Sequence, residues 1–216
     1  MQKQALAAIK LSGCTLPRPV ADVAADLVQL HGLLLKWQKV QNLVSRETLD
    51  QIWDRHIADS LQLVNLIQPT AKKIVDLGSG GGFPALPLAI ALKGQEVHFT
   101  LVEANSRKVA FLRAVARELG LNLKVVDERI DSFVSRETSP IDLITARALA
   151  SLDQLCAFSH PIWTANTRAL FHKGREHVEE ITESDARWQY DVVKHPSIVD
   201  QTGVILEISN LRPRSE

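Results

Sequence analysis

Apolar residues recur at helical spacing through the first third of the chain. Intervals of four, three, four and three residues separate Val23, Leu27, Leu30, Leu34 and Trp37. Residues spaced in this way share one face of a helix. A second helix is predicted over 47–67 by a similar register, and Pro69 ends it. We therefore predict a helical N-terminal extension over residues 1–70.

The pattern changes from residue 72 onward, where short β-rich runs alternate with helical stretches. Seven strands are predicted, at 72–77, 96–102, 122–126, 141–145, 167–172, 189–195 and 203–209. The helices predicted between the first five strands cover 84–93, 105–119, 131–135 and 151–163. Such alternation predicts an α/β domain over 71–216 with a mostly parallel, doubly wound sheet and helices on both faces. The last two strands are predicted to form an antiparallel hairpin.

The first predicted strand runs into a glycine-rich turn. Residues 74–84 read IVDLGSGGGFP, with glycine at four of the five positions from 78 to 82. Glycine has no Cβ and tolerates positive φ, so the backbone can approach a ligand closely. The apolar stretch after Pro84 reads as a helix, and its N-terminal N–H groups would point at that ligand. We therefore predict a cofactor site at Gly78 and Gly80.

Two cofactor classes fit this turn. Gly80, Gly82 and Ala85 satisfy the G-x-G-x-x-A spacing of dinucleotide-binding folds, which leaves a nicotinamide-dependent oxidoreductase as an alternative. Asp76 favours S-adenosylmethionine as the second class, because a carboxylate there would repel a pyrophosphate but suits a ligand with an ammonium group. The form D-x-G-x-G-x-G, which begins at Asp76, resembles the first motif of S-adenosylmethionine-dependent methyltransferases.

Acidic residues follow the next two predicted strands. Glu103 ends the second strand, where a carboxylate can hold ribose hydroxyl groups. Asp131 follows the third strand and is placed for an adenine amino group, with Ile130 against the ring. The alternatives are a neighbour of the helix cap for Glu103, with Asn105 or Ser106 as the cap itself, and a solvated N-cap for Asp131.

Arg147 follows the fourth predicted strand, so it is expected to face the cleft outside the strand carboxyl ends. The alternative is a surface ion pair. His56 and Asp59 are three residues apart on the second predicted helix. No further His or Cys completes a metal set with them, so we predict no metal site and expect a polar helix face or an interdomain contact instead. No catalytic dyad stands out.

Charge and cysteine content limit the partners. Lys plus Arg and Asp plus Glu both number 25, so nucleic-acid binding would need a local basic patch. Arg107, Lys108 and Lys173 are the candidates for RNA contact, although a solvated helix face also explains the first two. The two cysteines, Cys14 and Cys156, favour a reducing compartment. No run approaches the length of a membrane span, and we expect a cytoplasmic protein.

Six stretches carry a further signal, at residues 42–45 (NLVS), 55–60 (RHIADS), 76–87, 107–112 (RKVAFL), 145–148 (TARA) and 173–174 (KG). Together they resemble the RsmG family, also called GidB, of bacterial small-subunit rRNA methyltransferases. The resemblance extends over nearly the whole chain, and the combination is more specific than any one motif.

The resemblance implies a Rossmann-like class I methyltransferase fold with a seven-stranded sheet and an N-terminal helical part. It implies methylation of guanine N7 in 16S rRNA or in the small ribosomal subunit, with S-adenosyl-L-methionine as the cofactor. It also implies cofactor contacts at Gly78, Phe83, Ile130, Asp131 and Arg147. We expect a monomer. A non-catalytic RNA-binding module that kept this fold is a further alternative.

Overall fold

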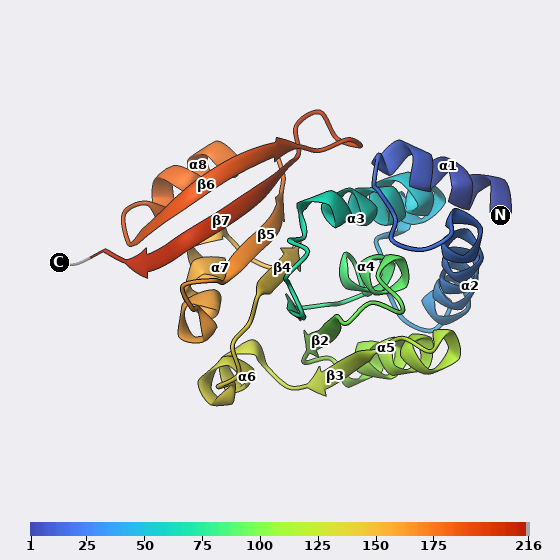
Figure 1. Ribbon diagram of the computed structural model, residues 1–216, viewed down its shortest axis with the longest axis horizontal. Coiled ribbons are helices and arrows are strands. Elements are labelled where there is room, and N and C mark those ends of the chain that lie inside the picture. The colour runs from blue at the N-terminus through green and yellow to red at the C-terminus, as the bar shows by residue number, and fades with distance from the viewer. Residues whose placement is uncertain (215–216) are drawn as a thin grey trace.

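The computed structural model describes residues 1–214, and the part before the first strand contains helical elements only (Figure 1). These elements are α1 (Gln2–Ser12), α2 (Val20–Gln38), the 3₁₀ helix η1 (Arg46–Gln51), the π-helix η2 (Ile52–Ala58), α3 (Asp59–Leu61) and the 3₁₀ helix η3 (Gln62–Leu66). The apolar face predicted for α2 is buried at Val23, Leu27, Leu30 and Leu34. The division of the chain at residue 70 stays a prediction.

The stretch predicted as one helix over 47–67 is helical as far as Leu66, but it is not one regular helix. The stretch changes from 3₁₀ to π, α and 3₁₀ geometry within about twenty residues. At the end of the π-helix, the Asp59 N–H donates to the carbonyl oxygens of both Asp54 and His56. Apolar periodicity could not reveal this widened turn. A π segment of this kind is often found at a functional site. Here it directly precedes Asp59, whose carboxylate contacts Arg147 of the sheet.

The seven predicted strands are confirmed, with shifts of a few residues at their ends. They are β1 (Lys73–Leu77), β2 (His98–Glu103), β3 (Leu123–Asp127), β4 (Leu143–Arg147), β5 (Arg168–Lys173), β6 (Trp188–Pro196) and β7 (Val204–Pro213). They form one sheet in the order β3-β2-β1-β4-β5-β7-β6. The first five strands are parallel, and β7 pairs antiparallel with both β5 and β6. The antiparallel hairpin is therefore also confirmed.

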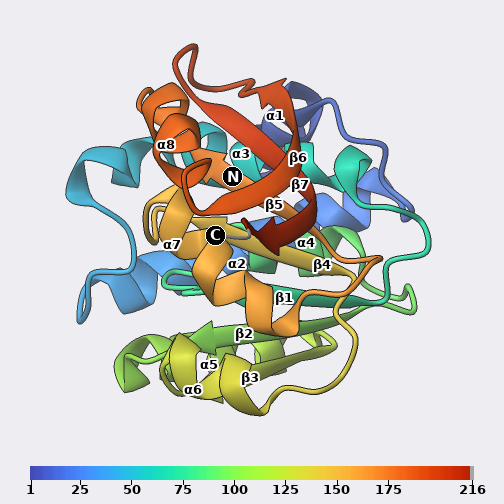
Figure 2. The same cartoon turned by 90° about the vertical axis from the view of Figure 1, so that its left-hand side faces the viewer.

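Helices cover both faces of this sheet. The remaining helical elements are α4 (Ala85–Ala91), α5 (Ser106–Leu119), α6 (Ile130–Arg136), α7 (Leu152–Ser159), the 3₁₀ helix η4 (His160–Ile162) and α8 (His177–Ser184). The sequence pattern did not predict α8, because its two apolar residues, Val178 and Ile181, are too few to mark a helix face. Only Ser184 in this helix is buried. Figure 2 shows α6, α7 and α8 on the face nearer the viewer.

Two apolar cores follow from this layering. Alternate residues of β1 point to opposite faces, so Ile74 belongs to one core and Val75 and Leu77 to the other. The first core also contains buried residues of α1, α2, α4 and α5, so the N-terminal helices pack directly on the sheet side that carries α4. The second core contains buried residues of α6 and α7.

The order of the strands reverses at β1, which lies between β2 and β4. Chains that leave adjacent strands in opposite directions open a crevice at the carboxyl ends of those strands. The glycine turn follows β1, Glu103 ends β2 and Arg147 ends β4. The fold therefore brings the predicted site residues to one edge of the sheet.

Candidate active site

The glycine turn after β1 presents open backbone. Gly78 and Gly80 have φ values of 65° and 54°, which other residues rarely adopt. A Cβ on Gly78 would lie 2.5 Å from Leu149 Cδ1, whereas a Cβ on Gly80 would meet no atom closer than 3.7 Å. Packing therefore fills one side of the turn at Gly78, and the side at Gly80 is open to a ligand.

A cavity of about 910 Å³ lies over this turn. Each residue predicted to contact the cofactor lines it, namely Gly78, Gly80, Phe83, Glu103, Ile130, Asp131 and Arg147. Segments from the N-terminal helical part and from the β6–β7 loop complete the wall. The structure thus brings the predicted positions together in one cavity, while their individual contacts with a ligand stay predictions.

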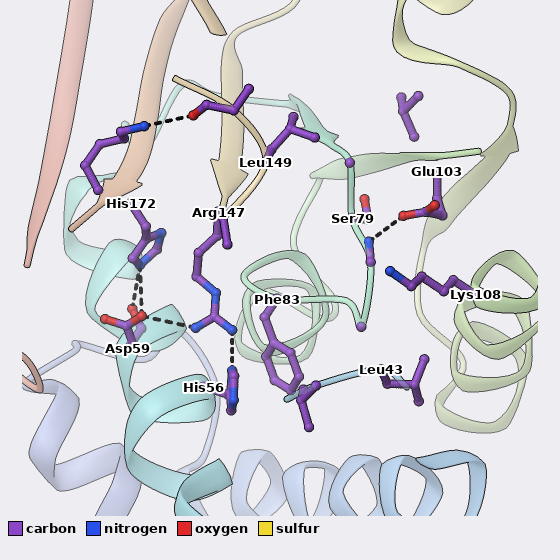
Figure 3. A pocket seen from close by; sticks show the side chains of 18 of the residues that line it. Leu43, His56, Asp59, Ser79, Phe83, Glu103, Lys108, Arg147, Leu149 and His172 are labelled. Atoms are coloured by element: carbon purple, nitrogen blue, oxygen red, sulfur yellow. Dashed lines mark hydrogen bonds and ion pairs between the residues drawn. The ribbon is translucent and has the colours of Figure 1, made fainter. Parts of the chain in front are cut away.

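Glu103 is fixed at the edge of the turn. Its Oε2 accepts a hydrogen bond from Gly80 N at 2.8 Å (Figure 3). Its Oε1 accepts one from Asn105 N at 2.8 Å. The Asn105 side chain caps α5 by accepting from the N–H groups of Arg107 and Lys108, as predicted for a cap at this position. A carboxylate held in this way keeps unused lone pairs for hydroxyl groups of a ligand.

Ile130 and Asp131 begin α6 at the side of the cavity beyond β3. The N-cap is Arg129, so the alternative of Asp131 as the cap is wrong. The Asp131 side chain is 63% exposed and lies 3.5 Å from Arg129 Nη2. An exposed pair of this kind contributes little to stability, which leaves the carboxylate free to accept from a ligand.

Asp76 does not face the cavity. Its residue is 1% exposed, and Oδ1 accepts a hydrogen bond from Thr145 Oγ1 at 2.7 Å. The pairing of β1 with β4 places Thr145 directly beside it. The other oxygen, Oδ2, is buried with no partner among the described residues, and burial raises the carboxyl pKa to about 6. The expectation that Asp76 meets a ligand ammonium group therefore fails, because the carboxylate lies beneath the turn.

Arg147 points from the end of β4 into the N-terminal helical part (Figure 3). Its Nη1 donates to Arg55 O at 2.9 Å and to Asp59 Oδ2 at 3.2 Å, and its Nη2 donates to His56 Nδ1. The guanidinium also lies 5.4 Å from the centre of the Phe83 ring. Because its side chain is only 17% exposed, the alternative of a surface ion pair is wrong.

Asp59 and His56 form the contact between the helical part and the sheet that the sequence left open. Asp59 also accepts from Gln62 Nε2 at 2.6 Å and lies 3.6 Å from His172 Nε2. His56 Nδ1 accepts from Arg147, so its Nε2 carries the proton and donates to Thr48 Oγ1 at 2.8 Å. Burial, then the charges of Arg147 and Arg55, lowers the pKa of His56 to about 3. His56 is therefore a neutral structural partner at neutral pH.

His172 is the residue of this cluster that sequence reasoning missed. It lies in β5, and its Nε2 approaches Asp59 O at 3.1 Å, across 113 residues of chain. No local motif surrounds it, so only the fold reveals the contact. Among residues 1–214, no group of three or more His, Cys, Asp and Glu side chains is arranged to hold a metal ion.

Comparisons with known proteins agree with this geometry. The family model described as rRNA small subunit methyltransferase G matches residues 24–208. The chain belongs to this family. The Ribosomal RNA small subunit methyltransferase G of Rhizobium etli is 49% identical over 185 residues, which cover 83% of this chain and 88% of the relative. That of Bartonella quintana is 45% identical over 188 residues, which cover 87% and 86%.

Solved structures support the fold of this methyltransferase G family member. An SAH-bound methyltransferase of Podospora anserina aligns with a TM-score of 0.57 at 15% identity and covers 86% of this chain and 88% of its own. A cofactor-bound protein from MTB aligns with a TM-score of 0.60 at 11% identity, covering 85% and 89%. The predicted Rossmann-like class I methyltransferase fold is confirmed. S-adenosylmethionine is the cofactor, and the nicotinamide alternative is not favoured.

The cavity of this rRNA methyltransferase fits that cofactor. Because Gly80 has no side chain, the space beside its backbone is free for a ligand. The Glu103 carboxylate lies next to Gly80. Ile130 offers an apolar side chain and Asp131 an exposed acceptor on the same side. The cavity wall therefore offers both apolar and polar groups, which suits a nucleoside.

The basic residues predicted to contact RNA are placed differently from one another. Lys108 lines the cavity near Gly80, but Arg107 does not line it and its carbonyl accepts from Gln41 Nε2. Lys173 lines the cavity but forms an ion pair with Glu180 at 2.5 Å and donates to Ala150 O, with 7% of its side chain exposed. The RNA contact of Lys173 stays a prediction, and its ion pair makes the ammonium group less available than that of Lys108.

Among the described residues, no helix has both the length and the apolarity needed to cross a membrane.

Proposed function

We propose that this methyltransferase transfers the methyl group of S-adenosylmethionine to N7 of a guanine in bacterial small-subunit rRNA. The observation that carries the proposal is the open glycine turn at the point of strand-order reversal, in a chain of the rRNA small subunit methyltransferase G family. The names of its relatives support the RNA, and the resemblance of its motifs supports guanine N7.

The cofactor roles that we propose follow the cavity wall. Glu103 would accept from ribose hydroxyl groups, and Ile130 and Asp131 would contact the adenine ring and its amino group. The backbone at Gly78 and Gly80 would contact the methionine portion. Phe83 and Arg147 would close the cavity beside it, with the guanidinium held away from the sulfonium by Asp59 and His56.

The reaction requires positioning more than proton transfer. When bound, S-adenosylmethionine supplies an electrophilic methyl group on sulfur. Guanine N7 carries a free lone pair at neutral pH, so the attacking atom needs no general base. His56 is held neutral between Arg147 and Thr48, which suits a structural role. Holding acceptor and donor in line within a cavity supplies several kcal/mol of rate enhancement.

The RNA must present an unstacked base to this cavity, because N7 of a stacked guanine in a helix is not accessible to it. Lys108 and Arg55 line the cavity and are our candidates for phosphate contacts at its mouth. We also infer that the enzyme acts as a monomer in the cytoplasm. Its two free cysteines support a reducing compartment.

Methyl incorporation into small-subunit RNA tests this function. Undermethylated small subunits and tritiated S-adenosylmethionine should yield labelled RNA with the wild-type chain. Gly78→Val should abolish incorporation, since the added side chain would strain a positive φ and clash with Leu149. Gly32→Ala, at a helical position with open space, is the matched control and should keep full activity. RNA binding without any incorporation would favour the non-catalytic alternative.

A further inference from the structure

The segment between α2 and η1 forms a wall of the cavity although it has no helix or strand of its own. Leu43, Val44 and Ser45 line the cavity, and the first two are each 8% exposed. Irregular backbone that is buried needs partners for its N–H and carbonyl groups. Groups outside the segment must therefore supply those partners.

One side chain supplies those partners. Gln38 Oε1 accepts from Leu43 N at 2.9 Å and from Val44 N at 3.1 Å, and Gln38 Nε2 donates to Val44 O at 2.9 Å. The side-chain amide of Gln38, at the end of α2, thus makes the backbone hydrogen bonds that a neighbouring strand would otherwise make. Glutamine is suited to this because it offers both an acceptor and donors on one planar group.

The Leu43 carbonyl of this wall lies against the glycine turn. A Cβ on Gly81 would lie 2.6 Å from Leu43 O, although the φ of Gly81 is not in the positive region that excludes other residues. Glycine at position 81 is therefore required by the approach of Leu43, and not by the local backbone. Gln38 therefore bonds the backbone of this segment, and Gly81 allows the Leu43 carbonyl to approach the turn.

The position of the wall points to the acceptor side of the cavity. Figure 3 shows Leu43 below the tip of the glycine turn, with Lys108 between it and Glu103. The cavity-lining residues that follow the wall in sequence, Thr48 and Arg55, also come from the helical part. By contrast, the candidate for ribose contact ends β2, and the candidates for adenine contact follow β3.

We propose that Gln38 is a positioning residue that holds the Leu43–Ser45 wall against Gly81 and thereby shapes the entry of the acceptor base. The inference rests on the proposed function for the identity of the acceptor. It assigns to Gln38 an effect on RNA use that is separate from cofactor binding, although Gln38 itself does not line the cavity.

A double-mutant cycle tests the inference. Gln38→Ala should raise the KM for undermethylated small subunits about tenfold, as expected for the loss of one or two hydrogen bonds in the positioned state. Gly81→Ala should raise the same KM because its added Cβ would displace the Leu43 carbonyl. The cofactor dissociation constant of Gln38→Ala, measured by calorimetry, should change less than about twofold. Because both variants release the same segment, the double variant should be no worse than the more impaired single one. Gln4→Ala, on the exposed side of α1, and Gly32→Ala serve as controls.

Hydrogen exchange provides a readout that needs no RNA. In the wild type, the Leu43 and Val44 amides should be protected, and Gln38→Ala should accelerate their exchange while α2 stays protected. Faster exchange of those amides with a raised KM supports the inference. Unchanged exchange, or single-variant effects that multiply in the double variant, would overturn it. If the wild type fails to methylate RNA but these amides respond as described, the proposed function is wrong and the positioning role stands.

Discussion

Arg147 at the end of β4 and Asp59 in α3 form an ion pair of 3.2 Å across 88 residues of chain. The pair joins the sheet to the N-terminal helical part at the wall of the cavity. Three of the five N–H groups of the guanidinium are engaged by Arg55, Asp59 and His56. The helical part therefore determines the orientation of Arg147.

Asp59→Ala should destabilise the protein by about 3–5 kcal/mol, because it leaves a largely buried guanidinium without its counter-charge. Urea unfolding measures the change. Arg147→Ala together with Asp59→Ala should cost less than the sum of the two single changes. Lys72→Ala breaks an exposed pair with Glu96 and should leave the stability nearly unchanged. Additive costs for Arg147 and Asp59 would show that the pair is not coupled.

Arg147→Ala should raise the cofactor dissociation constant and leave RNA affinity nearly unchanged, since the side chain lines the cavity beside Phe83. Calorimetry with cofactor and binding of RNA at several salt concentrations separate the two ligands. If Arg147 instead holds an RNA phosphate, the variant should weaken RNA binding and make its dependence on log salt shallower by about one unit. That outcome would remove Arg147 from the cofactor site.

Asp131→Ala should weaken S-adenosylmethionine and S-adenosylhomocysteine to the same extent, because both carry the adenine that we assign to this residue. The exposed side chain predicts a loss near the lower end of about 1–3 kcal/mol. Competition binding of the two ligands to one protein sample gives the ratio directly. Asp22→Ala, in the first turn of α2, is a control of equal charge change. A loss for only one ligand means that Asp131 does not contact adenine.

Local motifs allowed much of this site to be predicted. The turn at Gly78 and Gly80, and Glu103, are marked by their places at the ends of successive strands, so the strand order brings them together. The cluster of Asp59 and His172 joins residues 113 apart, and no spacing in the sequence encodes that contact. Asp76 was misread because its partner, Thr145, is set by the pairing of β1 with β4.

Two buried groups should give opposite slopes of stability with pH. His56 has a pKa of about 3 when folded against 6.5 ordinarily, so its contribution is lost as pH falls from about 6.5 toward 3. Asp76 has a pKa of about 6 against 3.8, so its contribution is present below about 3.8 and lost as pH rises toward 6. Between these limits the two effects oppose each other.

Relative to wild type, Asp76→Asn should therefore gain stability as pH rises from about 4 to 6, and His56→Gln should lose it over the same range. Each difference should be at most about 1.4 kcal/mol per pH unit, the limit for one proton. Urea unfolding at a series of pH values measures both. Curves that stay parallel to wild type would show that neither group changes its proton affinity on folding.

The position of the new methyl group tests methyl transfer to guanine N7 most directly. A guanine methylated at N7 carries a positive ring charge, which makes the chain cleavable there by borohydride reduction followed by aniline. Small-subunit RNA treated with the enzyme and S-adenosylmethionine should be cleaved at one additional guanine, and omission of the cofactor should abolish that cleavage. Tritium incorporated into the RNA without any new cleavage would contradict the claim.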